Sequence, residues 1–265
     1  MQILNSSPNI PALILAAGRG ERMRPLTDTT PKPLLPVRGK PLLQWHAQAL
    51  ARGGVTHLVI NTAWLGEQIQ KHFELHPLFY MHEQLLNQEQ KHKQVDIIYS
   101  HEGQDFGEAL ETLGGIVRAL PHLGDVFWVL AGDVFAPGFE FAPEAVQDFI
   151  ASDKLAHLWL VPNPEHNPRG DFGLDAAGLA LNLPKDAGHT LHTYSTIGLY
   201  RRTLFEAPWC DIPAGNPQGV KAPLAPLLRS AMDNQRISAE LYTGDWTDVG
   251  TPQRLTQLNS SPTPP

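Results

Sequence analysis

A short stretch near the start of the chain combines glycines with a concentration of positive charge. An apolar run is followed directly by Ala16, Ala17, Gly18 and Gly20. From Gly18 to Lys40, six arginines and lysines stand against two acidic residues, although the whole chain has a formal net charge of −7. Glycines let backbone N–H groups approach a ligand closely, and basic side chains neutralise phosphate oxygens. The stretch therefore predicts a polyphosphate-binding loop, whereas a solvated basic loop is the alternative interpretation.

The spacing of these residues excludes two common phosphate motifs. A third glycine at dinucleotide-binding spacing is missing, and no Gly-Lys-Ser/Thr follows as in a Walker loop. The cations of this stretch are Arg19, Arg22, Arg24, Lys32, Arg38 and Lys40, and Lys32 stands between two prolines.

Two aspartates further along the chain are candidate metal ligands. Asp133 follows the apolar run 126–131 and Gly132, and Asp248 lies in the glycine-bounded segment 244–251. Mg²⁺ prefers one or two carboxylates together with phosphate oxygens and water. An aspartate in an ordinary turn is the alternative for each of them. Asp245 is interpreted as a surface charge.

The elements that must position these residues alternate between strands and helices. Apolar runs predict strands over Ile10–Ala17, His57–Asn61, Val95–Ser100, Val126–Ala131 and His157–Val161. Helical spacing predicts helices over Pro41–Arg52, Trp64–Glu74, Glu108–Leu120 and Pro143–Ile150. This order predicts an α/β fold, with a mostly parallel sheet and helices on both faces. Ligands of such sheets bind at the carboxyl ends of the strands.

The later part of the chain is less regular. Further strands, with antiparallel pairing, are expected over Gly170–Ala180, Thr193–Arg201 and Ile237–Tyr242. The polar segment Leu75–Gln94 is interpreted as an insertion with helical character.

Bulk composition restricts the class of protein. The 265 residues suit one domain, predicted over 10–258 with flexible ends at 1–9 and 259–265. A sequence pI near 5.9 argues against nucleic acid or anionic membranes as partners. No apolar run approaches the roughly 18 residues of a membrane span. The single cysteine, Cys210, excludes an intrachain disulfide, so we expect a cytoplasmic protein.

The glycine-rich stretch resembles the nucleotide-sugar pyrophosphorylases, which join a nucleoside triphosphate to a sugar 1-phosphate. Their pattern is Ala-Gly-x-Gly-x-Arg-Met-x-Pro-Leu-Thr followed by Pro-Lys-Pro, and it matches here almost completely. The resemblance implies a Rossmann-like fold of the nucleotide-diphospho-sugar transferase type. It also implies that Arg22 and Lys32 act on triphosphate and transition-state charge. Gly-Asp and Trp-x-Asp-Val-Gly-Thr are the family's two metal motifs, which implies Mg²⁺ on Asp133 and Asp248.

The same resemblance implies sites for the two substrates. For the nucleotide it points to Ala16, Ala17, Gly18, Gly20, Glu102, Gly114 and Gly115. For the sugar it points to Asp171, Tyr194, Ser195 and Lys221. A sugar 1-phosphate is already an oxyanion near neutral pH, so we expect neither a covalent intermediate nor a strong general base.

A narrower resemblance is to the N-acetylmuramate α-1-phosphate uridylyltransferases of peptidoglycan recycling. It rests on Asn61–Gly66, Asn163–Phe172 and Leu224–Arg229, and it implies UTP as the nucleotide. The chain departs from the subgroup at Leu113 and Thr196, where the subgroup has glycines and where we expect added bulk beside the base and the sugar.

Three functions stay open at this point. The first is uridylyl transfer to N-acetylmuramate 1-phosphate. The second is the same chemistry on another pair, such as mannose 1-phosphate and GTP. The third is a weakly active paralogue that binds a nucleotide sugar and regulates a partner.

Overall fold

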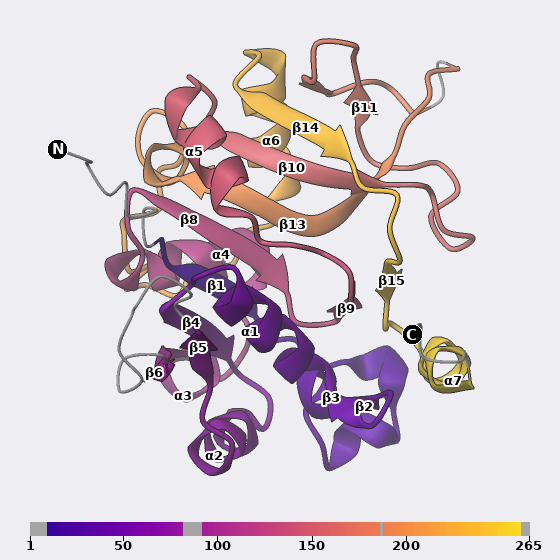
Figure 1. Ribbon diagram of the computed structural model, residues 1–265. Helices are drawn as coiled ribbons and strands as arrows, with labels where there is room; N and C mark the ends of the chain where they lie inside the picture. The colour runs from indigo at the N-terminus through magenta and orange to yellow at the C-terminus, as the bar shows by residue number, and fades with distance from the viewer. Residues whose placement is uncertain (1–9, 82–91, 186–187, 261–265) are drawn as a thin grey trace, which may run out of the picture.

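The computed structural model describes residues 10–81, 92–185 and 188–260, and its centre is a seven-stranded sheet (Figure 1). The strand order is β14-β10-β13-β8-β1-β4-β7. Within this sheet β13 runs antiparallel to β8 and β10, and the other pairs are parallel. The bounds are β1 Ala12–Leu15, β4 His57–Thr62, β7 Asp96–His101, β8 Val126–Ala131, β10 Ala156–Val161, β13 Thr193–Arg201 and β14 Ile237–Leu241.

Helices cover both faces of the sheet because its strands are apolar on both sides. In β1, Ala12 and Ile14 belong to one buried core and Leu13 belongs to the other. The first core includes side chains of α1 Leu42–Arg52, α2 Gly66–Leu75 and α5 Pro143–Ala151. The second includes side chains of α4 Glu111–Ala119 and α6 Ala225–Asp233.

Further helices and strands lie in the connections between these elements and after β14. The remaining helices are α3 Glu102–Phe106, α7 Pro252–Ser260 and 3-10 turns at Glu21–Met23, Leu26–Asp28, Lys32–Leu34, Leu120–His122 and Arg202–Phe205. The remaining strands form four antiparallel pairs: β2 Pro36–Val37 with β3 Lys40–Pro41, β5 Phe79–Met81 with β6 His92–Gln94, β11 Gly173–Leu174 with β12 Ala180–Leu181, and β9 Val134–Phe135 with β15 Thr247–Asp248.

The last helix closes onto the loop that follows β1. Figure 1 shows α7 on the same side of the molecule as the β2–β3 hairpin. Asn259 joins them, because its Oδ1 accepts from Arg38 N at 2.6 Å and its Nδ2 donates to the Pro36 carbonyl at 3.1 Å. The predicted flexible end 259–265 therefore begins inside α7. Residues 1–9 and 261–265 lie outside the described residues.

The predicted fold class is confirmed, and several element bounds agree closely. Val126–Ala131 and Thr193–Arg201 are strands with the predicted bounds. The first strand is shorter than Ile10–Ala17, because Ala16 N donates to the Asn61 side chain at 2.6 Å instead of continuing the ladder.

Other expectations are corrected. The strand from Ile237 pairs parallel with β10, because the connection through α6 brings it to the sheet edge in that direction. The expected strand Gly170–Ala180 is interrupted by a turn and becomes the β11–β12 hairpin. The ends of the Leu75–Gln94 insertion form β5 and β6, not a helix, and 82–91 lie outside the described residues. Among the described helices, none has the length and apolar character needed to cross a bilayer.

Candidate active site

Two adjoining cavities open at the carboxyl ends of β1 and β8. The charged cavity, of about 460 Å³, is lined by the glycine-rich loop and by Arg22, Lys32 and Asp133. The apolar cavity, of about 510 Å³, is lined by Asp171, Tyr194 and side chains of α6. Both are lined by Leu15, Thr112, Ala131 and Thr196, so they form one continuous cleft.

The loop of the charged cavity keeps its shape through one required glycine. Gly20 has φ +70°, and a Cβ there would fall 3.1 Å from Thr27 Cγ2 and 3.2 Å from Lys32 Cβ. Thr27 Oγ1 donates to the Gly20 carbonyl at 2.9 Å and closes the turn. Ala16, Gly18 and Gly20 line this cavity, whereas Ala17 is buried beside it.

The basic side chains of the loop separate into two groups. Arg22 and Lys32 line the charged cavity. Arg24 lies outside it and pairs with Asp28 at 2.7 Å. Lys32 is only 7% exposed, and its Nζ lies 2.5 Å from Asp133 Oδ2. An ammonium group buried to this degree depends on its anionic partner.

Pairing of β9 with β15 brings the two predicted metal ligands together. Asp248 lies opposite Val134, and Val249 N donates to the Asp133 carbonyl at 2.7 Å. His46 of α1 contacts the start of β9, because its Nε2 lies 2.6 Å from the Val134 carbonyl oxygen. Burial lowers the pKa of His46 to about 4, so the ring is neutral at pH 7 and Nε2–H donates. Two aspartates far apart in the chain are thus placed on adjoining backbone segments, and of the two Asp133 lines the charged cavity, whereas Asp248 does not.

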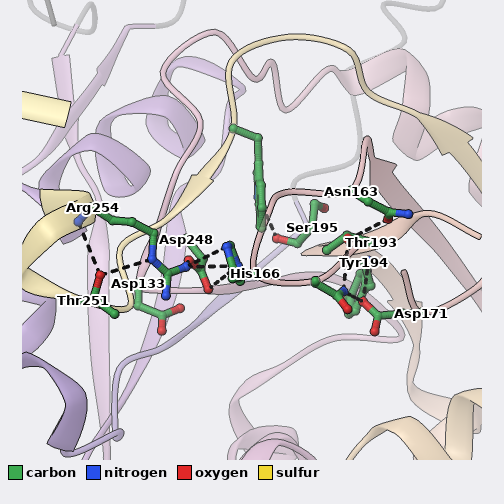
Figure 2. Close-up of polar contacts among 12 residues, drawn as sticks. Asp133, Asn163, His166, Asp171, Thr193, Tyr194, Ser195, Asp248, Thr251 and Arg254 are labelled. Carbon is green, nitrogen blue, oxygen red and sulfur yellow. Dashed lines mark hydrogen bonds and ion pairs between the residues drawn. The ribbon is translucent and has the colours of Figure 1, made fainter. Parts of the chain in front are cut away.

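Asp248 has two further partners that sequence reasoning missed. Its carboxylate pairs with Arg254 of α7, and its Oδ2 lies 3.2 Å from His166 Nε2 (Figure 2). Burial lowers the pKa of His166, and the charges of Arg254 and Arg22 lower it further. His166 lies in a segment that the sequence singled out, but Arg254 carried no local signal.

The two aspartates suit a small divalent ion bound together with phosphate. Among the described residues, no group of three or more His, Cys, Asp or Glu side chains gathers as an all-protein site. Two neighbouring carboxylates with room for phosphate oxygens and water match the preference of Mg²⁺. Lys32 and Arg254 now neutralise these carboxylates, which an ion would otherwise do.

The apolar cavity contains a few fixed polar groups. Asp171 Oδ2 accepts from Tyr194 N at 3.0 Å (Figure 2). It also accepts from Asn167 Nδ2 at 3.1 Å, and Lys185 Nζ lies 3.5 Å from Asp171 Oδ1. The Tyr194 hydroxyl lies 2.6 Å from that of Tyr200. These contacts fix the predicted sugar-site residues Asp171 and Tyr194 at one wall.

Arg229 of α6 lines the same cavity and was not assigned from sequence. Its guanidinium lies 5.1 Å from the centre of the Phe172 ring, and its Nη1 donates to Asn182 Oδ1 at 2.8 Å. The other charged residues that line this cavity, among those the structure describes, are the acids Glu111 and Asp171.

Several predicted site residues lie outside both cavities. Lys221 pairs with Glu108 at the surface. A Cβ on Gly114 would fall 2.4 Å from the Val220 carbonyl, so this glycine permits packing of α4 on segment 220–222. The side chain of Leu113, within α4, belongs to the buried core and lines neither cavity, so the expected added bulk does not arise in the cleft. Glu102 and Gly115 are also buried away from the cavities.

Thr196 lines the cleft, whereas the predicted sugar-site residue Ser195 does not. The β10–β13 pairing is interrupted here by a bulge, in which Ser195 is fully buried and its Oγ accepts from Ile197 N at 3.1 Å. Thr196 lines both cavities at φ +69°, and its Oγ1 is buried without a hydrogen-bond partner in the described structure. A β-branched residue is strained in this left-handed conformation, which explains why glycine suits the position.

Comparison with known proteins agrees with this geometry. Residues 11–263 match the nucleotidyl transferase family. This chain belongs to that family, and it is a nucleotidyltransferase. It is 44% identical over 255 residues to an N-acetylmuramate alpha-1-phosphate uridylyltransferase from Neisseria meningitidis serogroup B, covering 94% of this chain and 96% of that one.

More distant relatives share the fold. A UTP–glucose-1-phosphate uridylyltransferase from Synechocystis is 33% identical over 258 residues, which cover 90% of this chain and 60% of that protein. The crystal structure of HddC from Yersinia pseudotuberculosis, complexed with GMP-PN, has a TM-score of 0.65 at 18% identity. It covers 94% of this chain and 98% of that chain, and it supports the fold alone.

The strain at Thr196 generates a stability prediction. Thr196→Gly should raise the free energy of unfolding by about 1 kcal/mol, because it removes the strained φ and the unpaired hydroxyl. Urea unfolding at equilibrium measures the change. Thr196→Ala is the control, since it removes the hydroxyl but keeps a Cβ at positive φ. A glycine variant less stable than the alanine variant would contradict the interpretation.

Proposed function

We propose that the protein transfers a uridylyl group from UTP to N-acetylmuramate α-1-phosphate, giving UDP-N-acetylmuramate and pyrophosphate. The observation that carries the proposal is the 44% identity to the Neisseria meningitidis enzyme over nearly the full length of both chains. The proposal includes a cytoplasmic location, where UTP is available, and a role in peptidoglycan recycling.

The shape of the cleft supports a sugar 1-phosphate as the acceptor. Its phosphate would lie in the charged cavity and its ring in the apolar one, with the anomeric bond passing Thr196 at the junction. N-acetylmuramate also carries a carboxylate on its lactyl ether. Arg229, held against Phe172 and Asn182, offers that carboxylate a preoriented guanidinium.

The chemistry requires positioning and charge neutralisation more than proton transfer. An oxygen of the sugar phosphate attacks the α-phosphorus of UTP, the bond from that phosphorus to the bridging oxygen breaks, and pyrophosphate departs with the electron pair. Arg22 and Lys32 would hold the triphosphate and stabilise the charge of the leaving group.

A magnesium ion is part of the proposal. Asp133 and Asp248 would hold it, and when bound it supplies Lewis-acid neutralisation of the phosphate oxygens. Lys32 and Arg254, which now pair with these carboxylates, would then be released toward the phosphates.

The substrate pair is tested by pyrophosphate release with Mg²⁺. UTP and GTP are each combined with the 1-phosphates of N-acetylmuramate, N-acetylglucosamine, glucose and mannose. We expect the highest kcat/KM for UTP with N-acetylmuramate 1-phosphate. A maximum at another pair would replace the substrate but keep the phosphate chemistry. A flat grid would favour the weakly active, regulatory alternative.

Removal of one metal ligand should affect turnover more than folding. Asp133→Asn should lower kcat by roughly 100-fold or more, because a carboxylate ligand becomes a neutral amide. The amide oxygen can still accept from Lys32 and Asp133 is partly exposed, so the free energy of unfolding should fall by about 1 to 2 kcal/mol, less than the roughly 3 to 5 kcal/mol lost when a fully buried ion pair is broken. Steady-state kinetics over a Mg²⁺ titration measures the effect. The exposed Asp245→Asn is the matched control, and near-normal kcat in Asp133→Asn would refute the metal assignment.

Arg229 should determine selectivity for the lactyl carboxylate. Arg229→Gln should lower kcat/KM for N-acetylmuramate 1-phosphate by roughly 10- to 100-fold, through loss of a charge-assisted hydrogen bond. It should change kcat/KM for N-acetylglucosamine 1-phosphate by less than about threefold. Lys221→Gln, outside the cleft, is the control and should leave both values unchanged. Equal losses on both sugars would remove Arg229 from this role.

A further inference from the structure

Glu102 is a fully buried carboxylate that lines neither cavity of the cleft. Its exposed fraction is 0%. Its Oε1 accepts from Asn61 Nδ2 at 2.6 Å, and its Oε2 accepts from Leu110 N at 2.7 Å. Burial of a carboxylate is unfavourable unless its oxygens are hydrogen bonded, so both donors are needed to keep it in place.

Asn61 extends this contact to the phosphate-binding loop. The side chain is 3% exposed, and its Oδ1 accepts from Ala16 N at 2.6 Å. A carboxylate only accepts hydrogen bonds, so the amide nitrogen must face Glu102 and the amide oxygen must face Ala16. The orientation of Asn61 is therefore determined by its two partners. The chain of hydrogen bonds from Ala16 N through Asn61 and Glu102 to Leu110 N is called the relay below. Its first residue, Ala16, lines the charged cavity.

The other end of the relay holds the start of α4. Leu110 directly precedes Glu111, which has φ +60°, a conformation that is strained for a residue with a side chain. Glu111 and Thr112 line the apolar cavity. Such strain persists only where surrounding contacts fix the backbone, and the hydrogen bond to Glu102 is one of these contacts.

Gly115 leaves the space that Glu102 and Asn61 occupy, and Gly103 permits close packing on a neighbouring segment. A Cβ on Gly115 would fall 2.7 Å from Glu102 Oε1 and 2.8 Å from Asn61 Nδ2. A Cβ on Gly103 would fall 2.7 Å from the Ala63 backbone. Burial raises the pKa of Glu102, while the hydrogen bonds from Leu110 and Asn61 oppose that rise. An apolar side chain in place of Glu102 would leave both of these donors without an acceptor.

We infer that Glu102 is a positioning residue for nucleotidyl transfer, acting through Asn61 on the phosphate loop and through Leu110 on the cleft wall at Glu111. It touches no substrate itself. It links one wall of each cavity through a chain of hydrogen bonds between separate elements. The inference rests on the family's chemistry at this cleft, and it does not depend on which sugar is used.

A donor–acceptor exchange tests the inference. The glutamine amide in Glu102→Gln has one acceptor oxygen and one donor nitrogen, so its nitrogen faces either Asn61 Nδ2 or Leu110 N, and both of these are donors. If the Asn61 amide rotates to present its oxygen to the glutamine, its nitrogen then faces the donor Ala16 N. The double variant combines Asn61→Asp with Glu102→Gln. Its new carboxylate at position 61 accepts from Ala16 N and from the glutamine amide, whose oxygen accepts from Leu110 N. Every hydrogen bond and the net charge are restored.

We expect Glu102→Gln to lower kcat/KM by roughly 10- to 100-fold at a temperature where it stays folded, and to weaken nucleotide binding. The double variant should regain most of both. Steady-state kinetics, isothermal titration with the nucleotide and thermal unfolding are measured for each variant. Glu206→Gln, an exposed glutamate that pairs with Arg202, is the matched control.

Two outcomes would overturn the inference. One is wild-type kcat/KM and nucleotide affinity in Glu102→Gln. The other is a double variant that regains thermal stability but neither kcat/KM nor affinity, since that separates the relay's structural effect from catalysis. The kinetics use whichever triphosphate and sugar 1-phosphate the wild type turns over best. A failure of the proposed substrate is thereby seen in the wild type, separately from a failure of the relay.

Discussion

The ion pair between Lys32 and Asp133 joins two segments that are 101 residues apart and forms the floor of the charged cavity. Lys32 is nearly buried, so its charge would be unfavourable without this partner. Asp133 in turn fixes β9, because its carbonyl accepts from Val249 N and its neighbour Val134 pairs with β15. Asp133 therefore connects Lys32 to β15, where Asp248 pairs with Arg254 of α7.

Ion pairs with Asp133 and Asp248 also compensate the positive charges that lie close together at the cleft. Arg22 and Arg254 approach each other at Gly250, where a Cβ would fall 2.6 Å from Arg254 Nη2 and 3.4 Å from Arg22 Nη2. The two aspartates balance these cations within the protein. In the proposed mechanism Lys32 and Arg254 would exchange these carboxylates for phosphate oxygens when the polyphosphate and a metal ion bind. The basic and acidic side chains of the site thus balance one another's charge within the protein.

Two residues of the cleft wall have a strained backbone conformation, which is unfavourable for stability. Thr196 and Glu111 both have positive φ, and both line the apolar cavity. The bulge of β13 holds Thr196, and the buried Glu102 relay holds the residue before Glu111. Strained residues are commonly kept at binding sites where the surroundings fix them. In this protein the surroundings are a sheet irregularity in one case and a buried charge in the other.

The sequence by itself determined the α/β fold, and it predicted a phosphate-binding role for the glycine-rich loop and a metal-binding role for Asp133 and Asp248. These features depend on local patterns: apolar runs of strand length, glycines beside charge, and an aspartate at a strand end. Only the tertiary structure decided that Gly114 and Gly115 serve packing, that Lys221 pairs at the surface, and that Arg254 reaches Asp248. The physical reason is that burial and hydrogen-bond partners come from segments distant in the chain. Residue type and spacing record which groups are present, but not which of them meet.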